Sequence, residues 1–126
     1  AHHYFRDFSY CDSGMLPWLL IAELLCTSGK SLAQFVKDAE AKYPISGEIN
    51  SEVADANAAV QCVYEAYKDK AEGEDRTDGI SLSFGNWRFN LRCSNTEPVV
   101  RLNVESKGDK ALVDEKTKEI FAILRK

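Results

Sequence analysis

The sequence predicts an α+β fold whose C-terminal part is an antiparallel sheet with two helices on one face. Three runs between residues 80 and 105 alternate apolar and polar side chains, which is typical of antiparallel strands covered on one side only. A segment of helical spacing precedes these runs and another follows them. Residues 45–126 therefore read as β-α-β-β-β-α, and residues 1–44 add one strand and two helices before them.

The N-terminal segment is apolar but offers no sheet that its helices can cover. Residues 4–10 are aromatic and predict a strand, and Asp12-Ser13-Gly14 can cap a helix over residues 15–26. That helix is apolar on nearly every face, so we expect it to be buried on most sides. Two explanations stay open: the chain begins inside a larger protein that supplies the partner, or the helix docks on the C-terminal sheet in one compact domain.

The segments that follow have well-defined boundaries. Ser31 and Gln34 form a capping box for a second helix, and Pro44 ends that helix. Residues 45–50 then predict a short strand. Residues 53–70 predict a third helix, because apolar side chains recur there at helical spacing, and a charged loop follows at residues 71–78.

Each strand of the predicted sheet has one inward and one outward set of side chains. Gly85-Asn86 joins the first two strands as a hairpin turn, Lys107-Gly108 closes the third, and Asp109 caps the last helix. The side chains expected in the core are Ile80, Leu82, Phe84, Trp87, Phe89, Leu91, Val100, Leu102, Val104, Val113, Thr117, Ile120 and Leu124.

Composition restricts the ligands that the chain can bind. It is 44% hydrophobic and 29% charged, which is typical of a folded domain, and its net charge of −4 provides no general attraction to nucleic acid. An anion must therefore be held by a local site. The apolar run at residues 15–26 is shorter than the ~20 residues that cross a bilayer, and we find no targeting segment. We expect a cytoplasmic protein that binds neither membrane nor nucleic acid.

The four cysteines are Cys11, Cys26, Cys62 and Cys93. They form no CxxC pair and have no histidine cluster beside them, so we expect no zinc site and reduced thiols instead of disulfides. Cys93 has two interpretations, a small packing side chain or a reactive thiol.

The most informative segment is Arg92-Cys93-Ser94-Asn95-Thr96-Glu97-Pro98, which lies between two predicted strands. Leu91 faces the core, so Arg92 points to the polar face, where its guanidinium can bind two phosphate oxygens at once. The Ser94-Asn95-Thr96 turn adds hydroxyl, amide and backbone N–H donors, whereas Glu97 has the wrong sign for this role. The alternative is an ordinary polar turn whose side chains bond their own backbone.

Several separated motifs match one known family in the right order. The loop at residues 92–98 closely resembles the phosphate-binding R-x-S-N-T-x-P loop of the α-D-phosphohexomutases, which are the phosphomannomutases and phosphoglucomutases. Residues 75–80 resemble the D-G-(I/V) sequence with which a strand of this family starts, and residues 46–50 and 2–14 also match. The resemblance covers essentially the whole chain and points most strongly to bacterial phosphomannomutases of the GDP-mannose pathway.

The resemblance implies a four-domain parent of which this chain is the C-terminal part. Residues 1–44 would be the end of the third domain, an α/β domain, and residues 45–126 the fourth, a small domain similar to the TATA-binding-protein fold that closes over the substrate phosphate. The phosphoserine and the aspartates that bind Mg²⁺ belong to the first and second domains of such a parent. We therefore expect this chain to bind no metal and to be inactive alone.

The resemblance also implies a reaction. The family interconverts mannose 6-phosphate and mannose 1-phosphate through a phosphoserine and a sugar 1,6-bisphosphate, which also acts as activator. The expected partners are this sugar phosphate and the missing N-terminal domains. The residues implied to bind the substrate phosphate are Arg92, Ser94, Asn95 and Thr96.

Further residues near these motifs receive a role. His2 matches the family histidine proposed as a general acid or base at a sugar hydroxyl. His3, Arg6 and Trp87 are expected to be structural. Arg88 and Arg101 either add positive potential or are simply solvated residues of a strand face.

Two other functions stay open at this point. The chain is alternatively an autonomous protein-interaction module that binds through the polar face of the sheet or through the apolar helix. It is also compatible with a phosphoglucomutase or a phosphoglucosamine mutase, since the sugar-recognition loop of the family is expected upstream of residue 1. Neither the preferred hexose nor the oligomeric state follows from the sequence, nor whether residues 1–44 are ordered without the rest of their domain.

Overall fold

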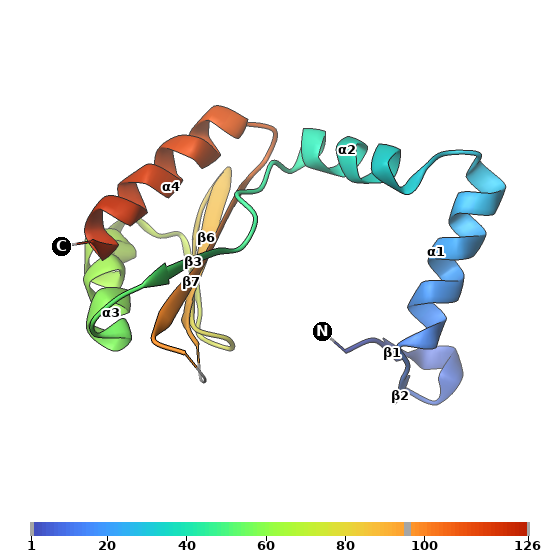
Figure 1. Cartoon of the computed structure of the whole chain (residues 1–126), viewed down its shortest axis with the longest axis horizontal. Helices are drawn as coiled ribbons and strands as arrows, with labels where there is room; N and C mark the ends of the chain where they lie inside the picture. The colour runs from blue at the N-terminus through green and yellow to red at the C-terminus, as the bar shows by residue number, and fades with distance from the viewer. Residues whose placement is uncertain (1, 95–96, 126) are drawn as a thin grey trace. The chain divides into compact units, whose positions relative to one another are not determined.

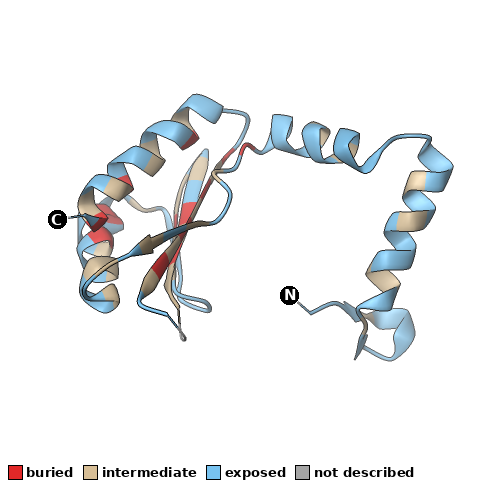
Figure 2. Ribbon diagram, viewed as in Figure 1, coloured by how far each residue is buried: buried red, intermediate tan, exposed pale blue. Residues whose placement is uncertain are grey.

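The computed structural model describes residues 2–94 and 97–125, and the chain consists of two compact units (Figure 1). The first unit comprises Ala1–Asp38 and the second comprises Ala39–Lys126. Helix α2 (Leu32–Lys42) crosses the boundary between them. All of the buried side chains among the described residues belong to the second unit, as Figure 2 shows.

The first unit begins with a small hairpin. Strand β1 (Tyr4–Phe5) pairs antiparallel with β2 (Cys11–Asp12), and a 3-10 turn (Arg6–Phe8) lies between them. The prediction of one strand over residues 4–10 is therefore wrong. Ser9 and Tyr10 have φ values of 53° and 55°, which are left-handed, so the chain turns back where the aromatic pattern indicated an extended strand.

Helix α1 (Met15–Ser28) forms where the sequence predicted a helix, with the Leu16 N–H donating to the Ser13 hydroxyl at 3.2 Å. The expectation that it would be buried on most sides is not met, because none of its residues is buried. The only sheet of its unit, among the described residues, is the two-stranded hairpin, which is too small to cover it. Its exposed large apolar side chains are Met15, Trp18, Leu19, Leu20, Ile21 and Leu24.

Helix α2 starts and stops as predicted. The Gln34 N–H donates to the Ser31 hydroxyl at 3.2 Å, which confirms half of the capping box, whereas the Gln34 side chain donates to Asp38 at 2.8 Å. The helix ends before Pro44. In the described part of the chain no single helix is long and apolar enough to cross a membrane, and α1 and α2 reach that length and hydropathy only when taken together as a bent pair.

The second unit is built on a five-stranded antiparallel sheet in the order β3-β7-β6-β5-β4. Its central strands β5 (Ile80–Phe84), β6 (Trp87–Cys93) and β7 (Val99–Ser106) are the three that alternation predicted. The edge strand β3 (Ile49–Glu52) begins later than expected. The edge strand β4 (Gly73–Asp75) lies in the segment 71–78 that was predicted as a charged loop, and that prediction is wrong for these residues. They are all exposed, and they pair with β5 at the edge of the sheet.

Helices α3 (Ala56–Tyr67) and α4 (Lys110–Leu124) lie on one face of this sheet (Figure 1), which confirms the predicted fold class. A 3-10 turn (Lys68–Lys70) extends α3. Asp55 and Asp109 cap the two helices by accepting from Ala58 N at 3.0 Å and Leu112 N at 2.9 Å. The buried core consists of Val63, Tyr67, Leu82, Phe89, Leu91, Val100, Leu102, Val104, Val113, Ile120 and Leu124.

The one-sided core has a direct consequence for the polar side chains. Alternate residues of β5, β6 and β7 point away from the core that the sheet shares with α3 and α4. Polar groups on that face keep access to solvent and to ligands. The face is called the polar face of the sheet from here on.

Tyr67 joins the two helices to the sheet at one end of the core. Its ring packs edge-on against Phe84, Trp87 and Phe89, and its hydroxyl donates to Glu119 at 3.1 Å. Burial, reinforced by the Glu119 carboxylate, raises the pKa of Tyr67 to about 12. The folded state therefore favours the neutral phenol.

This raised pKa predicts a loss of stability at alkaline pH. The contribution of Tyr67 is complete below its ordinary pKa of 10.0 and is lost as the pH rises through about 12. The free energy of unfolding, measured by urea denaturation, should fall less over this range in Tyr67→Phe than in the parent chain. The exposed-site variant Tyr43→Phe is the control and should follow the parent. Equal losses in the parent and in Tyr67→Phe would contradict the assignment.

Candidate anion-binding site

The polar face brings charged and amide side chains into opposing pairs. Strands β6 and β7 pair antiparallel, and the last three pairs on this face are Arg88 with Glu105, Asn90 with Asn103 and Arg92 with Arg101. The pair of arginines lies nearest to the loop that joins the two strands. Two positive charges thus meet at the end of the sheet where the sequence predicted phosphate binding.

Arg92 has the orientation that the alternation predicted. Its neighbour Leu91 is 1% exposed in the core, whereas the Arg92 side chain is 32% exposed. Its guanidinium donates to Glu48 at 2.9 Å and to Asp78 at 3.1 Å. These carboxylates, Glu48 foremost, raise the pKa of Arg92 above its ordinary value, so this side chain stays a cation.

Within residues 2–94 and 97–125, the contacts of Arg101 with acidic side chains are longer than those of Arg92. Its Nη1 lies 3.6 Å from Glu48 and its Nη2 lies 3.9 Å from Glu97. Both separations exceed the ~2.7–3.2 Å of a direct N–H···O hydrogen bond. Its buried Nε atom has no hydrogen-bond partner among the described residues. Like charges at opposing positions destabilise a sheet, so the carboxylates nearby offset a repulsion that the register creates.

Glu48 reaches both arginines because the chain bulges just before β3. Ile45 faces Glu105 and Ile49 faces Leu102, so the three residues 46–48 lie against the two residues 103–104. This is a β-bulge, and within it Gly47 has a left-handed φ of 72°. The bulge directs the Glu48 carboxylate so that one oxygen contacts Arg92 and the other Arg101.

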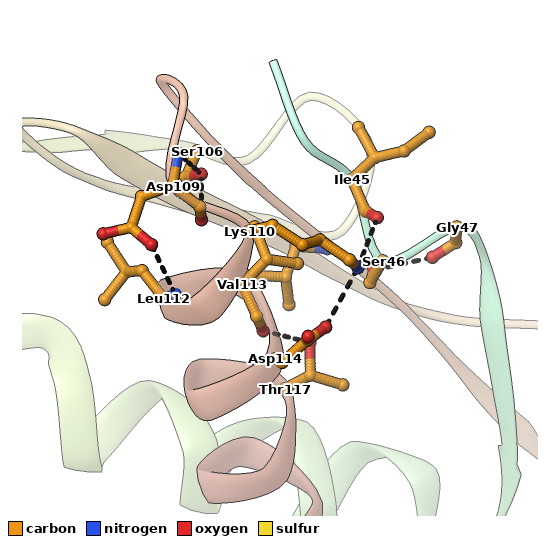
Figure 3. A network of polar contacts seen from close by, with 11 residues as sticks. Ile45, Ser46, Gly47, Ser106, Asp109, Lys110, Leu112, Val113, Asp114 and Thr117 are labelled. Carbon is orange, nitrogen blue, oxygen red and sulfur yellow. Dashed lines mark hydrogen bonds and ion pairs between the residues drawn. The ribbon is translucent and has the colours of Figure 1, made fainter. Parts of the chain in front are cut away.

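Ile45, which precedes the bulge, and Ser46, its first residue, are tied to α4 and to β7 (Figure 3). The Ser46 hydroxyl accepts from the Val104 N–H at 2.9 Å, and the Lys110 ammonium donates to the Ile45 carbonyl at 3.3 Å. Lys110 also pairs with Asp114 one turn further along α4, at 2.9 Å. The first turn of α4 therefore contacts the chain three residues before Glu48.

Asp78 and Gly79 support Arg92 from the side of β5. The Asp78 carbonyl accepts from the Asn90 side chain at 2.7 Å, while its carboxylate binds Arg92. Gly79 has a φ of 73°, and a Cβ atom there would lie 2.5 Å from the Leu91 carbonyl oxygen and 2.6 Å from the Arg92 Cβ. Only glycine allows this turn to pass so close behind Arg92.

The loop after Arg92 is described in part. The Ser94 N–H donates to the Val99 carbonyl at 2.9 Å and closes the base of the loop. Asn95 and Thr96, which were predicted to bind phosphate, lie outside the described residues. The Cys93 thiol lies 3.6 Å from the Asn57 side chain of α3, a contact on the helix-covered side of the sheet that favours the packing interpretation.

His2, predicted as an acid or base, lies in the first unit. Its Nδ1 atom is hydrogen-bonded to the Asp12 carboxylate of β2, and this contact lowers the pKa of Asp12. The sequence did not predict this pair. A carboxylate on one ring nitrogen orients the imidazole, which is an arrangement common to histidines that transfer protons.

The described residues do not fit a metal ion. Within residues 2–94 and 97–125, no group of three or more His, Cys, Asp or Glu side chains is arranged to hold one. Glu48, Asp78 and Glu97 are directed at arginines instead. The four cysteines are unpaired thiols.

Sequence reasoning did not link Glu48 or Asp78 to Arg92, and it left two interpretations of Arg101 open. Glu48 lies 44 positions before Arg92 and Asp78 lies 14 before it, so no local pattern joins them. One signal was present in the sequence, because each of these acids adjoins a glycine, Gly47 or Gly79. Counting back from a short hairpin loop would also have placed Arg101 opposite Arg92.

The close packing of Gly79 predicts the outcome of adding a single methyl group. Gly79→Ala adds left-handed strain and a backbone clash and should destabilise the chain by about 2–4 kcal/mol. The matched control is Gly108→Ala, since Gly108 has a φ of 77° but nothing within 4 Å of its Cβ position; strain alone should cost ~1–2 kcal/mol there. Urea denaturation measures the free energy of unfolding of both variants. Equal losses would show that the close approach of residue 79 to Arg92 adds nothing to the cost of the left-handed strain.

Two models of one protein family match this chain. The family model of the phosphoglucomutase/phosphomannomutase C-terminal domain matches residues 48–123, and the model of alpha/beta/alpha domain III of the same family matches residues 1–43. A solved family protein from Burkholderia thailandensis matches 64% of this chain and 18% of its own at 20% identity, with a TM-score of 0.49.

Curated relatives are much more similar in sequence. The chain is 60% identical over 124 residues to the phosphomannomutase of Salmonella montevideo and 56% identical to that of Escherichia coli K12; each match covers 98% of this chain and 27% of the relative. It is 60% identical to a protein of Xanthomonas campestris strain B100 named phosphohexose mutases, over 99% of this chain and 28% of that protein. The chain thus spans about a quarter of the length of these relatives. It belongs to the phosphoglucomutase/phosphomannomutase family.

Proposed function

We propose that this chain is part of a phosphomannomutase, an isomerase that interconverts mannose 6-phosphate and mannose 1-phosphate through a phosphoserine and a bisphosphorylated sugar. Residues 45–126 form its phosphate-clamping C-terminal domain, and residues 1–44 form the end of the preceding α/β domain. The names of the Salmonella and Escherichia relatives support mannose as the sugar. The broader name of the Xanthomonas relative supports hexose phosphates in general, so phosphoglucomutase activity is the alternative.

The proposed role of this chain rests on the position of Arg92. Arg92 stands at the end of β6 on the polar face, oriented by Glu48 and Asp78, next to the Ser94 turn. A guanidinium held in this way presents parallel N–H donors that match two oxygens of a phosphate group. The proposed clamp consists of Arg92, Ser94, Asn95 and Thr96.

The proposed reaction explains why such a clamp suits this domain. The phosphoserine donates its phosphoryl group to one end of the sugar phosphate, and the bisphosphorylated sugar then turns over and returns the other group. While one phosphate faces the serine, the clamp holds the other at a distance, so it must accept either end of the intermediate. An arginine with small neutral donors recognises phosphate and ignores the stereochemistry of the sugar. Closure of the domain would also exclude water, which otherwise hydrolyses the phosphoserine.

His2 is proposed as the general acid or base at the sugar hydroxyl. The Asp12 carboxylate holds its Nδ1 atom, so Nε2 is the atom that would exchange a proton with the substrate. In the family that this chain resembles, aspartates of another domain bind Mg²⁺. The roles proposed here for residues of this chain do not involve that metal ion.

The clamp predicts a phosphate affinity that depends on Arg92. Isothermal titration of the 126-residue chain with inorganic phosphate and with mannose 1-phosphate should show binding. Arg92→Gln should weaken both affinities about tenfold or more, because a charge-assisted bidentate contact is lost. Glucose 1-phosphate should bind as well as mannose 1-phosphate.

The matched control is Arg88→Gln. Arg88 lies on the same strand and face, it forms an ion pair with Glu105, and its replacement changes the net charge equally. It should leave the phosphate affinity close to that of the parent. Equal affinity in the parent and in Arg92→Gln, or equal weakening by both variants, would rule out the proposed clamp.

A further inference from the structure

We propose that Arg101 is the second guanidinium of the anion site, and that Glu48 is the internal carboxylate that the anion displaces from the two arginines. This inference rests on the proposed function of Arg92 and extends the site to two residues outside the loop at residues 92–98. Arg101 lies on β7, and Glu48 lies in the bulge just before β3.

The register places Arg101 within reach of the same anion as Arg92. Opposing side chains on antiparallel strands have Cβ atoms ~4.5–5.5 Å apart, a spacing that one phosphate group can bridge through two of its oxygens. Arg101 is 30% exposed, so its guanidinium is accessible from the polar face. Its contacts with Glu48 and Glu97 are longer than the contacts that Arg92 makes with Glu48 and Asp78, as far as the described part of the chain shows.

Glu48 already occupies the place of such an anion. Its two carboxylate oxygens divide between the two guanidiniums, 2.9 Å from Arg92 and 3.6 Å from Arg101. A phosphate would make the same pair of contacts with more charge and a third oxygen. The Glu48 carboxylate therefore contacts both arginines in the absence of ligand and loses these contacts when phosphate binds.

The local charge explains why one carboxylate must yield. Arg92 and Arg101 are surrounded by Glu48, Asp78 and Glu97, which is two positive against three negative charges. Asp78 and Glu97 are 73% and 63% exposed, so solvent screens them, whereas Glu48 is 39% exposed and touches both arginines. Glu48 is therefore the principal competitor of an incoming phosphate.

This competition fits the reaction proposed above. The clamp must release one phosphate and accept the other each time the intermediate turns over. A built-in carboxylate lowers the affinity for phosphate and re-forms the arginine pair after release. Glu48 acts here as a positioning residue, and Arg101 as a residue that binds the substrate phosphate.

Phosphate titration of four variants tests the proposal. Arg101→Gln should weaken binding of inorganic phosphate about tenfold, and Arg101→Lys, which keeps the charge but not the fork, should bind with intermediate affinity. Glu48→Gln keeps the length and one oxygen of the side chain but removes the competing charge, so it should bind phosphate about fivefold more tightly. Glu105→Gln, which removes the acid paired with Arg88 on the same face, is the control for Glu48→Gln and should leave the affinity unchanged.

The outcomes separate this inference from the function on which it rests. If Arg92→Gln weakens binding while Arg101→Gln matches Arg88→Gln, the clamp stands and Arg101 has no part in it. If Glu48→Gln binds phosphate no more tightly than Glu105→Gln, Glu48 is not a competitor. If Arg92→Gln has no effect either, the proposed function itself fails. Amide NMR spectra of each variant show whether the sheet is intact, and Arg101→Lys provides the test of Arg101 if Arg101→Gln does not fold.

Discussion

The arrangement of the site depends on the repulsion between two arginines that face each other on neighbouring strands. Backbone register alone places Arg92 opposite Arg101, and this contact would destabilise the sheet if it stood alone. An anion between or beside the two guanidiniums offsets this repulsion. In the described structure that anion is the Glu48 carboxylate. The same reasoning explains why a phosphate would bind here, because it offers the arginines a stronger counter-charge than the chain itself does.

The rest of the unit positions these groups. Burying one face of the sheet under α3 and α4 fixes which side chains of β6 and β7 point outward. The bulge at residues 46–48 then directs Glu48 across β7, and the contact of Lys110 with the Ile45 carbonyl ties that segment to α4. Gly79 lets the turn after β4 pass directly behind Arg92. Backbone geometry and helix packing thus place the polar groups, and the contacts of Arg92 with Glu48 and Asp78 hold them there.

Much of this unit could be predicted from the sequence, because the patterns involved are local. The alternation of Leu82, Phe89 and Leu102 with polar neighbours predicted three strands and their buried face, and it also predicted the outward direction of Arg92. Strand β4 could not be predicted, since it is held by backbone pairing and has no apolar face. The contact between Glu48 and Arg92 was likewise hidden, because it depends on how a distant bulge meets a hairpin. In the first unit, the left-handed residues Ser9 and Tyr10 overrode the strand propensity of their aromatic neighbours.

The central claim is that one anion binds to both arginines and takes the place of Glu48. The most direct measurement follows the side-chain Nε–H signals of Arg92 and Arg101 by NMR while inorganic phosphate is added to the chain. The account predicts that both signals shift together along one binding curve, accompanied by the backbone amide of Glu48, while signals of α3 and α4 stay in place. Shifts confined to other parts of the chain, or a response of Arg92 without Arg101 and Glu48, would contradict it.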